Sequence, residues 1–243
     1  MAETKSSAGR PAAAPSRRGA APKLAGVERA PAERRARATA ADRAARRRAI
    51  LDAALAEFSA HGFATAKLDA VARRAGIAKG TLYLYFTDKE ALFRGLVEEN
   101  ITPIFADADT LVADAPGDTR TLLDVLIALM IDRVLDQPAA ALVRLMIGEG
   151  GRFPGLAAFY HREVVARGIA LIRQVAQRGV DRGELASDAA VRFPQLVVAP
   201  AILAIVWNGL FADIEPLDPR ALLAAHRDVL LKGLGAEPRG KDD

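Results

Sequence analysis

The sequence has no cysteine, few aromatic residues and no long apolar run. The absence of cysteine excludes disulfide bonds, a cysteine nucleophile and thiolate metal sites. It fits a reducing, intracellular setting, so we expect a cytoplasmic protein. The longest apolar run, residues 196–207, is interrupted by Pro200 and is well short of the roughly 20 residues that a membrane-spanning helix needs. The chain also lacks the apolar N-terminal segment of a signal peptide, so we expect neither secretion nor a membrane partner.

Acidic residues are scarce in the first part of the chain. Residues 1–48 hold 13 Lys and Arg against 4 Asp and Glu, a net charge of 13 − 4 = +9, whereas the remainder has (34 − 13) − (30 − 4) = −5. This asymmetry predicts either a polyanion partner near the N-terminus or a solvated tail. Large apolar residues are almost absent from residues 1–41, so this segment cannot bury enough surface to offset its ordering entropy. We predict that residues 1–41 and 237–243 are disordered.

Alternation with a period of two residues is too short everywhere to predict a strand. From Asp42 onward, apolar residues recur at spacings of three and four, which is typical of helices. The sequence therefore predicts an all-α fold, with Thr87 and Glu90 as a capping box at the start of the fourth helix. The expected helices cover residues 42–61, 68–75, 79–86, 87–113, 119–136, 138–148, 154–182, 190–212 and 218–234.

Two short helices follow the first long one and are joined by a tight turn, residues 75–78. Gly76 permits the positive φ that such a bend requires. A long helix followed by two short helices around a glycine turn matches the helix-turn-helix pattern. At ~100° per residue, Leu82 and Phe86 lie within about 40° of each other and must face the first two helices. The pattern predicts that residues 79–86 form a recognition helix.

The outer side of this helix would carry Gly80, Thr81 and Leu84. Tyr83 and Tyr85 fall on its two edges, where each ring can lean on the core while its hydroxyl points outward. In a DNA major groove, these edges face the two phosphate walls. Gly80 would let the backbone approach, and Thr81 could bond a base edge or touch a thymine methyl. Leu84 could meet a thymine methyl or contribute nothing.

The segment AVARRAGIAKGTLYLYFTDKEALF, residues 70–93, resembles the DNA-binding signature of the TetR (tetracycline repressor) family of bacterial transcriptional regulators. The match extends from about residue 45 to residue 96 and includes AILDAALAEFSAHGF for the first helix. The later segment EGGRFPGLAAFYHREVVARG resembles one branch of the family's C-terminal domains.

This resemblance implies a DNA-binding domain at residues 42–96 and a larger helical domain at 97–236 that binds a ligand and dimerises. It implies a homodimer on a palindromic operator in double-stranded DNA, most often a repressor that a small molecule releases. By position, Thr81 would contact bases, whereas Lys79, Tyr83, Tyr85 and Lys89 would contact phosphates. The second helix departs from the family, because Ala66 and Lys67 stand where hydroxyl residues are common. The predicted DNA contacts are Arg46, Arg47, Lys67, Lys79, Gly80, Thr81, Tyr83, Leu84, Tyr85 and Lys89.

Residues 196–211 are apolar nearly all round, which predicts burial on more than one side. Together with residues 221–234 they are the expected dimer interface. An apolar bias among the candidate pocket residues indicates a hydrophobic or aromatic effector, although core packing is the commoner role for each of them. The candidates are Arg144, Met146, Phe159, Tyr160, Trp207 and Phe211.

The sequence offers no nucleophile–base pair, phosphate loop or metal-ligand spacing. We therefore expect no catalytic residue, no metal and no cofactor, and a regulator rather than an enzyme. Two other functions stay open from the sequence: a ligand-independent or architectural DNA-binding protein, motivated by the basic tail, and a transcriptional activator of the same fold.

Overall fold

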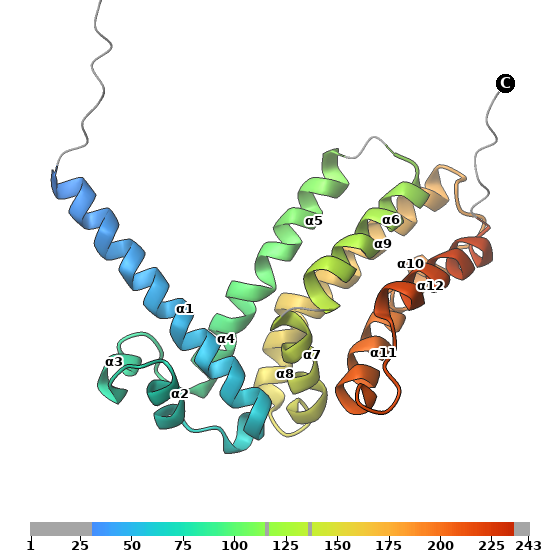
Figure 1. Ribbon diagram of the computed structural model, residues 1–243. Helices are drawn as coiled ribbons and strands as arrows, with labels where there is room; N and C mark the ends of the chain where they lie inside the picture. Colours follow the sequence, from blue (N-terminus) through green and yellow to red (C-terminus); the bar gives the residue numbers. More distant parts are fainter. Residues whose placement is uncertain (1–30, 115–116, 136–137, 236–243) are drawn as a thin grey trace, which may run out of the picture. The chain divides into compact units, whose positions relative to one another are not determined.

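The computed structural model describes residues 31–114, 117–135 and 138–235. The chain divides into two units, residues 1–42 and 43–243. Every regular element among the described residues is helical, which confirms the predicted all-α class (Figure 1). In chain order the elements are α1 (Pro31–Thr65), α2 (Leu68–Arg74), α3 (Lys79–Tyr83), α4 (Lys89–Asn100), α5 (Thr102–Asp114), α6 (Thr119–Met130), the π-helix η1 (Ile131–Leu135), α7 (Pro138–Glu149), α8 (Pro154–Tyr160), the π-helix η2 (His161–Val165), α9 (Ala166–Asp181), α10 (Ala189–Arg192), α11 (Gln195–Phe211) and α12 (Pro219–Gly233).

The first helix is longer than predicted. It begins at Pro31 rather than at Asp42, so the prediction of disorder is wrong for residues 31–41. Alanine and arginine have high helix propensity even where no apolar surface is buried. Proline also fits the first helical position, where its missing N–H would have no partner in any case. Residues 1–30 and 237–243 lie outside the described residues.

The break predicted at Gly62 is present. This glycine has φ 72° and ψ 165°, a conformation that interrupts α1 three residues before its end at Thr65. The amide of Ala66 then donates to the Gly62 carbonyl at 3.2 Å, which closes the turn that leads into α2. The chain therefore changes direction at the residue that lacks a Cβ atom.

Two predicted helices are each divided in the structure. The expected helix over 87–113 is interrupted at Ile101, with φ −115°, between α4 and α5. The expected helix over 190–212 is interrupted at Phe193, with φ −127°, between α10 and α11. Pro103 and Pro194 follow these breaks closely, and proline cannot donate the hydrogen bond that would continue a helix through it.

The start of α4 also differs in detail from the prediction. Asp88, not Thr87, is the N-cap, because its side chain accepts a hydrogen bond from the Ala91 amide at 2.7 Å. The Thr87 hydroxyl instead donates to the Asp88 carboxylate at 3.0 Å. The bond from the Ala91 amide lowers the pKa of Asp88 below its ordinary value.

The apolar residues form a large cluster around α1–α4, α7 and α8, and a second one around α5, α6 and α9–α12. Phe93 of α4 is fully buried in the first cluster and packs edge-on to Phe63 and Phe159, with ring centres 6.3 and 6.4 Å apart. Phe63 in turn packs edge-on to Phe153, at 4.9 Å. These rings connect the helices of the predicted DNA-binding domain to the segment before α8.

Helix α11 contains Pro200 and packs against α12 (Figure 1). Among the described ranges, no helix combines the length and the apolar character that crossing a bilayer would require.

Candidate nucleic-acid interface

The turn between α2 and α3 has the geometry that its sequence predicted. Gly76 has φ 67°, a left-handed conformation that glycine adopts without strain. The amide of Ile77 donates to the Ala72 carbonyl at 3.0 Å and holds the turn against the end of α2. Helix α3 therefore leaves α2 at a fixed angle, as a helix-turn-helix requires.

The inner side of α3 is anchored as predicted. Leu82 is fully buried and Phe86 is almost fully buried, and both belong to the first apolar cluster. The α-helix itself ends at Tyr83, earlier than the predicted Phe86, and the amide of Tyr85 bonds back to the Leu82 carbonyl at 2.9 Å. This tighter last turn keeps the residues after Tyr83 close to their predicted directions.

The outer side of α3 is open to solvent. Leu84 is 77% exposed and Tyr83 is 45% exposed. Gly80 is exposed, and a Cβ atom there would meet nothing within 4 Å, so the fold itself does not require glycine at this position. Thr81 and Tyr85 are half-buried. The helical wheel therefore divided α3 correctly into an inner and an outer side.

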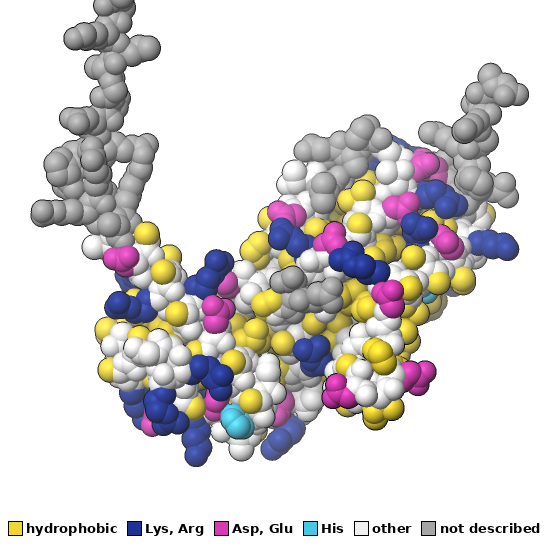
Figure 2. All heavy atoms as spheres, in the orientation of Figure 1, with side chains coloured by type: hydrophobic (Ala, Val, Ile, Leu, Met, Phe, Trp, Pro, Cys, Tyr) yellow, Lys and Arg dark blue, Asp and Glu magenta, His cyan; other side chains and the backbone are white. Residues whose placement is uncertain are grey.

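Basic side chains gather over α2 and α3 (Figure 2). Lys79, the first residue of α3, is ion-paired with Asp69 of α2, with Nζ 2.7 Å from the carboxylate and both side chains more than half exposed. The hydrogen bond from Lys79 to Asp69 raises the pKa of the Lys79 ammonium above its ordinary value. Arg43 of α1 lies over the ring of Tyr85 at 5.9 Å, and Arg46 is exposed.

Two more of the predicted DNA contacts, Lys89 and Arg47, are engaged within the protein. Lys89 donates through Nζ to the carbonyl oxygens of Phe63 and Ala64, each at 2.8 Å. Arg47 pairs with Glu98 at 3.2 Å and with Glu99 at 2.8 Å. These two cations connect α1 to α4 at two places.

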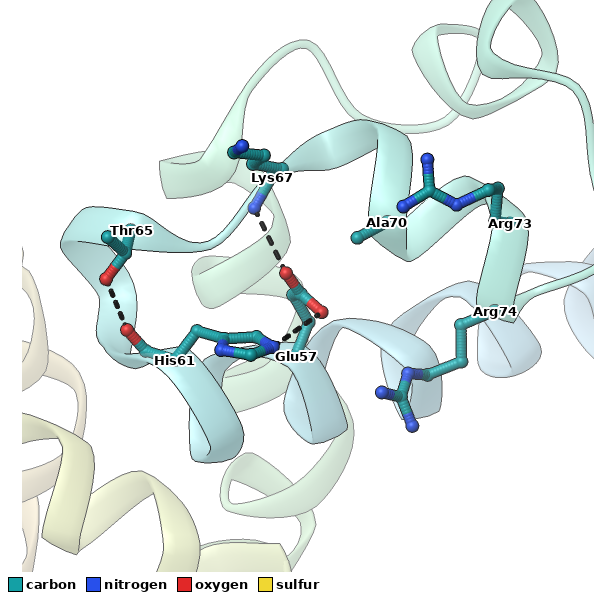
Figure 3. Close-up of a pocket in the computed structure, with 7 residues that line it drawn as sticks. All are labelled: Glu57, His61, Thr65, Lys67, Ala70, Arg73 and Arg74. Atoms are coloured by element: carbon teal, nitrogen blue, oxygen red, sulfur yellow. Dashed lines mark hydrogen bonds and ion pairs between the residues drawn. The ribbon is translucent and has the colours of Figure 1, made fainter.

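An open cleft of about 710 Å³ lies between α1 and α2 (Figure 3). Glu57 of α1 is 4% exposed and accepts a hydrogen bond from the Lys67 amide, at 3.3 Å, before α2 begins. His61 lies 3.8 Å from the same carboxylate. The cleft is lined by Glu57, His61, Thr65, Lys67, Ala70, Arg73 and Arg74.

The cleft includes residues that the sequence analysis did not single out. Arg73 and Arg74 occupy the last turn of α2, and both are exposed. Lys67 is the N-cap of α2 and has an extended backbone, whereas Arg73 and Arg74 end the helix. Two adjacent arginines directly before the predicted turn are a signal that could have found them. Glu57 was missed because nothing in its local sequence indicates that it would cap another helix.

The predicted pocket residues fall into two groups. Phe159 and Tyr160 are buried in the first apolar cluster, and Met146 packs against it. Burial raises the pKa of the Tyr160 phenol to about 12. Trp207 and Phe211 of α11 pack edge-on, with ring centres 5.2 Å apart, and Trp207 donates to the Glu215 carbonyl at 2.7 Å.

Arg144 of α7 is exposed and lies against α11. A Cβ atom at Gly209 would come within 2.7 Å of the Arg144 side chain. The six candidates therefore lie in two groups, one at the first apolar cluster and one at α11.

Comparison with known proteins agrees with this geometry. Residues 50–96 match the model of bacterial regulatory proteins of the tetR family, and residues 113–229 match a tetracyclin repressor-like C-terminal domain. The HTH-type transcriptional regulator SrpR of Pseudomonas putida is 30% identical over 177 residues, which cover 72% of this chain and 80% of SrpR. The chain belongs to the tetR family of bacterial regulatory proteins.

Other family members share one or both domains. The HTH-type transcriptional repressor SCO4008 of Streptomyces coelicolor is 33% identical over 137 residues, which cover 54% of this chain and 65% of the repressor. The structure of the SmeT–triclosan complex superposes with a TM-score of 0.64 at 23% identity, covering 78% of this chain and 91% of SmeT, which shows a common fold. This tetR-family chain is thus a DNA-binding transcriptional regulator, and α2 and α3 form its helix-turn-helix.

Proposed function

We propose that this tetR-family protein is a homodimeric repressor that binds a palindromic operator and is released from it by a small apolar molecule. The observation that carries the proposal is the open outer side of α3 above the buried Leu82 and Phe86. Such a helix can enter a major groove without losing its own packing. The proposed DNA-binding domain covers residues 42–96 and the proposed regulatory domain residues 97–236, and the protein would act in the bacterial cytoplasm.

The exposure of the side chains supports a division of roles in the DNA contact. Gly80, Thr81 and Leu84 lie on the open side of α3 and would meet base edges or thymine methyls. Tyr83 and Tyr85, at the two edges, would contact phosphates.

Among the basic residues, Lys67 and Arg46 are exposed and suited to contact phosphates. Lys89 and Arg47 bond other parts of the protein, so we propose that they position the helix-turn-helix rather than bind DNA. Lys79 differs from both sets, because it is exposed like Lys67 and Arg46 but is ion-paired with Asp69.

The exposed apolar residues of α11 and α12 support dimerisation. Leu203 and Leu210 of α11 are 51% and 66% exposed, and Val229 of α12 is 70% exposed. An apolar face of this extent on two adjacent helices favours a protein partner. A second copy of the same face would form a twofold dimer and place two α3 helices about 34–36 Å apart, one turn of DNA.

The proposed effector is apolar or aromatic. SmeT, which shares the fold, was solved as a complex with triclosan, a molecule of this kind. Met146, Phe159 and Tyr160 offer one apolar wall, and they belong to the same cluster as Phe93 of α4. A ligand that displaced this wall would act directly on a helix of the proposed DNA-binding domain. Trp207, Phe211 and Arg144 are the alternative lining, at α11.

A gel-shift experiment on the DNA upstream of the protein's own gene tests the proposal. The intact dimer should retard this fragment, and unrelated DNA should compete weakly. Thr81→Ala should relax the preference at one base pair, whereas Tyr83→Phe should weaken binding to all sequences alike. Triclosan is a suitable first probe of release. If the dimer retards neither this fragment nor any duplex at low salt, the proposed function is wrong.

The same experiment distinguishes a repressor from a ligand-independent, architectural DNA-binding protein. A protein of that kind would bind every duplex with similar affinity and would not respond to small molecules. A repressor would instead discriminate its operator by at least about a thousandfold at physiological salt.

A further inference from the structure

The ion pair between Asp69 and Lys79 stands out among the charges around α3. The exposed cations Arg46, Lys67, Arg73 and Arg74 form no ion pair within the described part of the chain, whereas Lys79 is paired at 2.7 Å. Asp69 bonds this lysine of the next helix rather than Arg73, which lies four residues ahead on α2 and would be the usual partner within a helix. The pairing is therefore selective for the cation at the start of the recognition helix.

The pair contributes little to holding the fold. Its side chains are 56% and 53% exposed, and exposed ion pairs in general have small effects on stability. The turn between α2 and α3 is already held by Gly76 and by the Ile77 amide, while Leu82 anchors α3 from inside. Asp69 also lies in the first turn of α2, where a carboxylate favours the helix, but that effect does not require the bond to Lys79.

The charge of the pair matters more where DNA would approach. Each phosphate that a lysine or arginine neutralises releases counterions and adds affinity for every duplex, whatever its sequence. Lys79 adjoins Gly80 and Thr81, on the open side of α3. With its ammonium bonded to Asp69, the local net charge of the two side chains is zero. A carboxylate at this surface also repels phosphates.

We propose that Asp69 restrains the sequence-independent part of the DNA affinity by holding Lys79 away from the phosphate backbone. This inference rests on the proposed function, because it assumes that the outer side of α3 meets DNA. It assigns Asp69 a role in recognition and removes Lys79 from the set of phosphate ligands. Less of the total DNA affinity would then come from phosphate contacts. The distinction between operator and other DNA would depend more on the groups on the open side of α3.

Salt titrations with a random-sequence duplex test the inference without knowledge of the operator. The full-length protein and its Asp69→Asn, Lys79→Met and doubly substituted variants would be titrated by fluorescence anisotropy between about 50 and 200 mM KCl. Asp69→Asn should bind tighter than the wild type at the lower salt concentration. Its affinity should also fall more steeply with salt, by about threefold more over this range if the freed lysine neutralises one further phosphate.

The Lys79→Met variant shows whether Lys79 itself binds a phosphate in the wild type. With Asp69 present, the variant leaves that carboxylate unpaired, so the affinity for every duplex should fall somewhat. The salt slope should change little, because no lysine–phosphate contact is lost. Combined with Asp69→Asn, Lys79→Met should abolish the increase in affinity. Asp188→Asn is the matched control, since Asp188, the residue before α10, pairs with Arg192 at 3.1 Å with similar exposure. It removes the same formal charge and should leave the titration unchanged.

Three results would overturn the inference. The first is a fall of the salt slope by about 0.9 in Lys79→Met alone, which would mean that the lysine leaves Asp69 to bind a phosphate. The second is an unchanged titration for Asp69→Asn. The third comes from a selection from a random duplex library. If Asp69→Asn changes the preferred base at a single position there, Asp69 contacts a base. If the wild type binds no duplex at all, the proposed function fails instead.

Discussion

Replacing Lys89 by methionine tests whether this residue supports the protein or binds DNA. Methionine keeps an unbranched stem of similar length and removes the ammonium. In the wild type, Nζ donates to the carbonyl oxygens of Phe63 and Ala64 at 2.8 Å each, and it lies 5.3 Å from the centre of the Phe63 ring. The substitution therefore leaves two acceptors without their partner at the connection between α1 and α2.

The expected loss of stability follows from these contacts. A hydrogen bond to a charged group contributes about 1.5–3 kcal/mol. Both bonds share one ammonium, whose dehydration on burial offsets part of the gain. Lys89 is also only partly buried, so we expect the free energy of unfolding to fall by about 2–3 kcal/mol rather than by the full sum.

Urea unfolding followed by circular dichroism measures this loss. Protein concentration must be held constant, because the stability of a dimer depends on it. Lys67→Met is the matched control, since Lys67 is exposed and makes no side-chain ion pair within the described residues. It should leave the urea midpoint nearly unchanged.

The opposite pattern would refute the reasoning. If Lys89 contacts phosphate, as the family resemblance implies, Lys89→Met should unfold at the same urea concentration as the wild type. Its DNA affinity should instead fall for all duplexes, with a salt slope lower by about 0.9.

Three further changes test other parts of the structure. Gly62→Ala should cost about 1–3 kcal/mol in urea unfolding, because φ 72° and ψ 165° suit glycine alone. Its Cβ would also lie 2.6 Å from a carboxylate oxygen of Glu149, so adding Glu149→Ala should relieve the clash but not the strain. Asp88→Ala should cost about 1 kcal/mol at neutral pH. The pKa of Asp88 is lower in the folded protein than in the unfolded chain, so this stabilisation is present above the unfolded-state pKa. It is lost as the pH falls through the folded-state pKa. The melting temperatures of variant and wild type should therefore converge in acid. Leu210→Asp should yield a monomer in light scattering, whereas Ile147→Asp, at a similarly exposed position, should leave the dimer intact. A dimeric Leu210→Asp variant would contradict the proposed interface.

The two sides of the recognition helix were predictable from the sequence because helical geometry alone decides them. Leu82 and Phe86 recur at four residues, and any helix over this segment places them together. Their burial and the exposure of Leu84 confirm this. The position of the Gly76 turn followed from the same local reasoning.

The partners of the charged residues were not predictable in the same way. Lys89 and Arg47 are both predicted DNA contacts, but one bonds carbonyls 25 and 26 residues away and the other bonds Glu98 and Glu99. A long flexible side chain reaches whichever acceptor the fold brings near it. Only the packing of α1 against α4 decides that these acceptors lie nearby.

The sequence by itself determined the helical class, the helix-turn-helix and the face of α3 that is open to solvent, because backbone preferences and apolar spacing act over a few residues. The tertiary structure decided which cations are not bonded within the protein and where the pocket candidates lie. It decided that Glu57 accepts a hydrogen bond from the Lys67 amide at the start of α2. It also decided that Asp69 meets Lys79. Electrostatic and hydrogen-bond partners depend on the distance between groups in space, and that distance is set only when the helices pack.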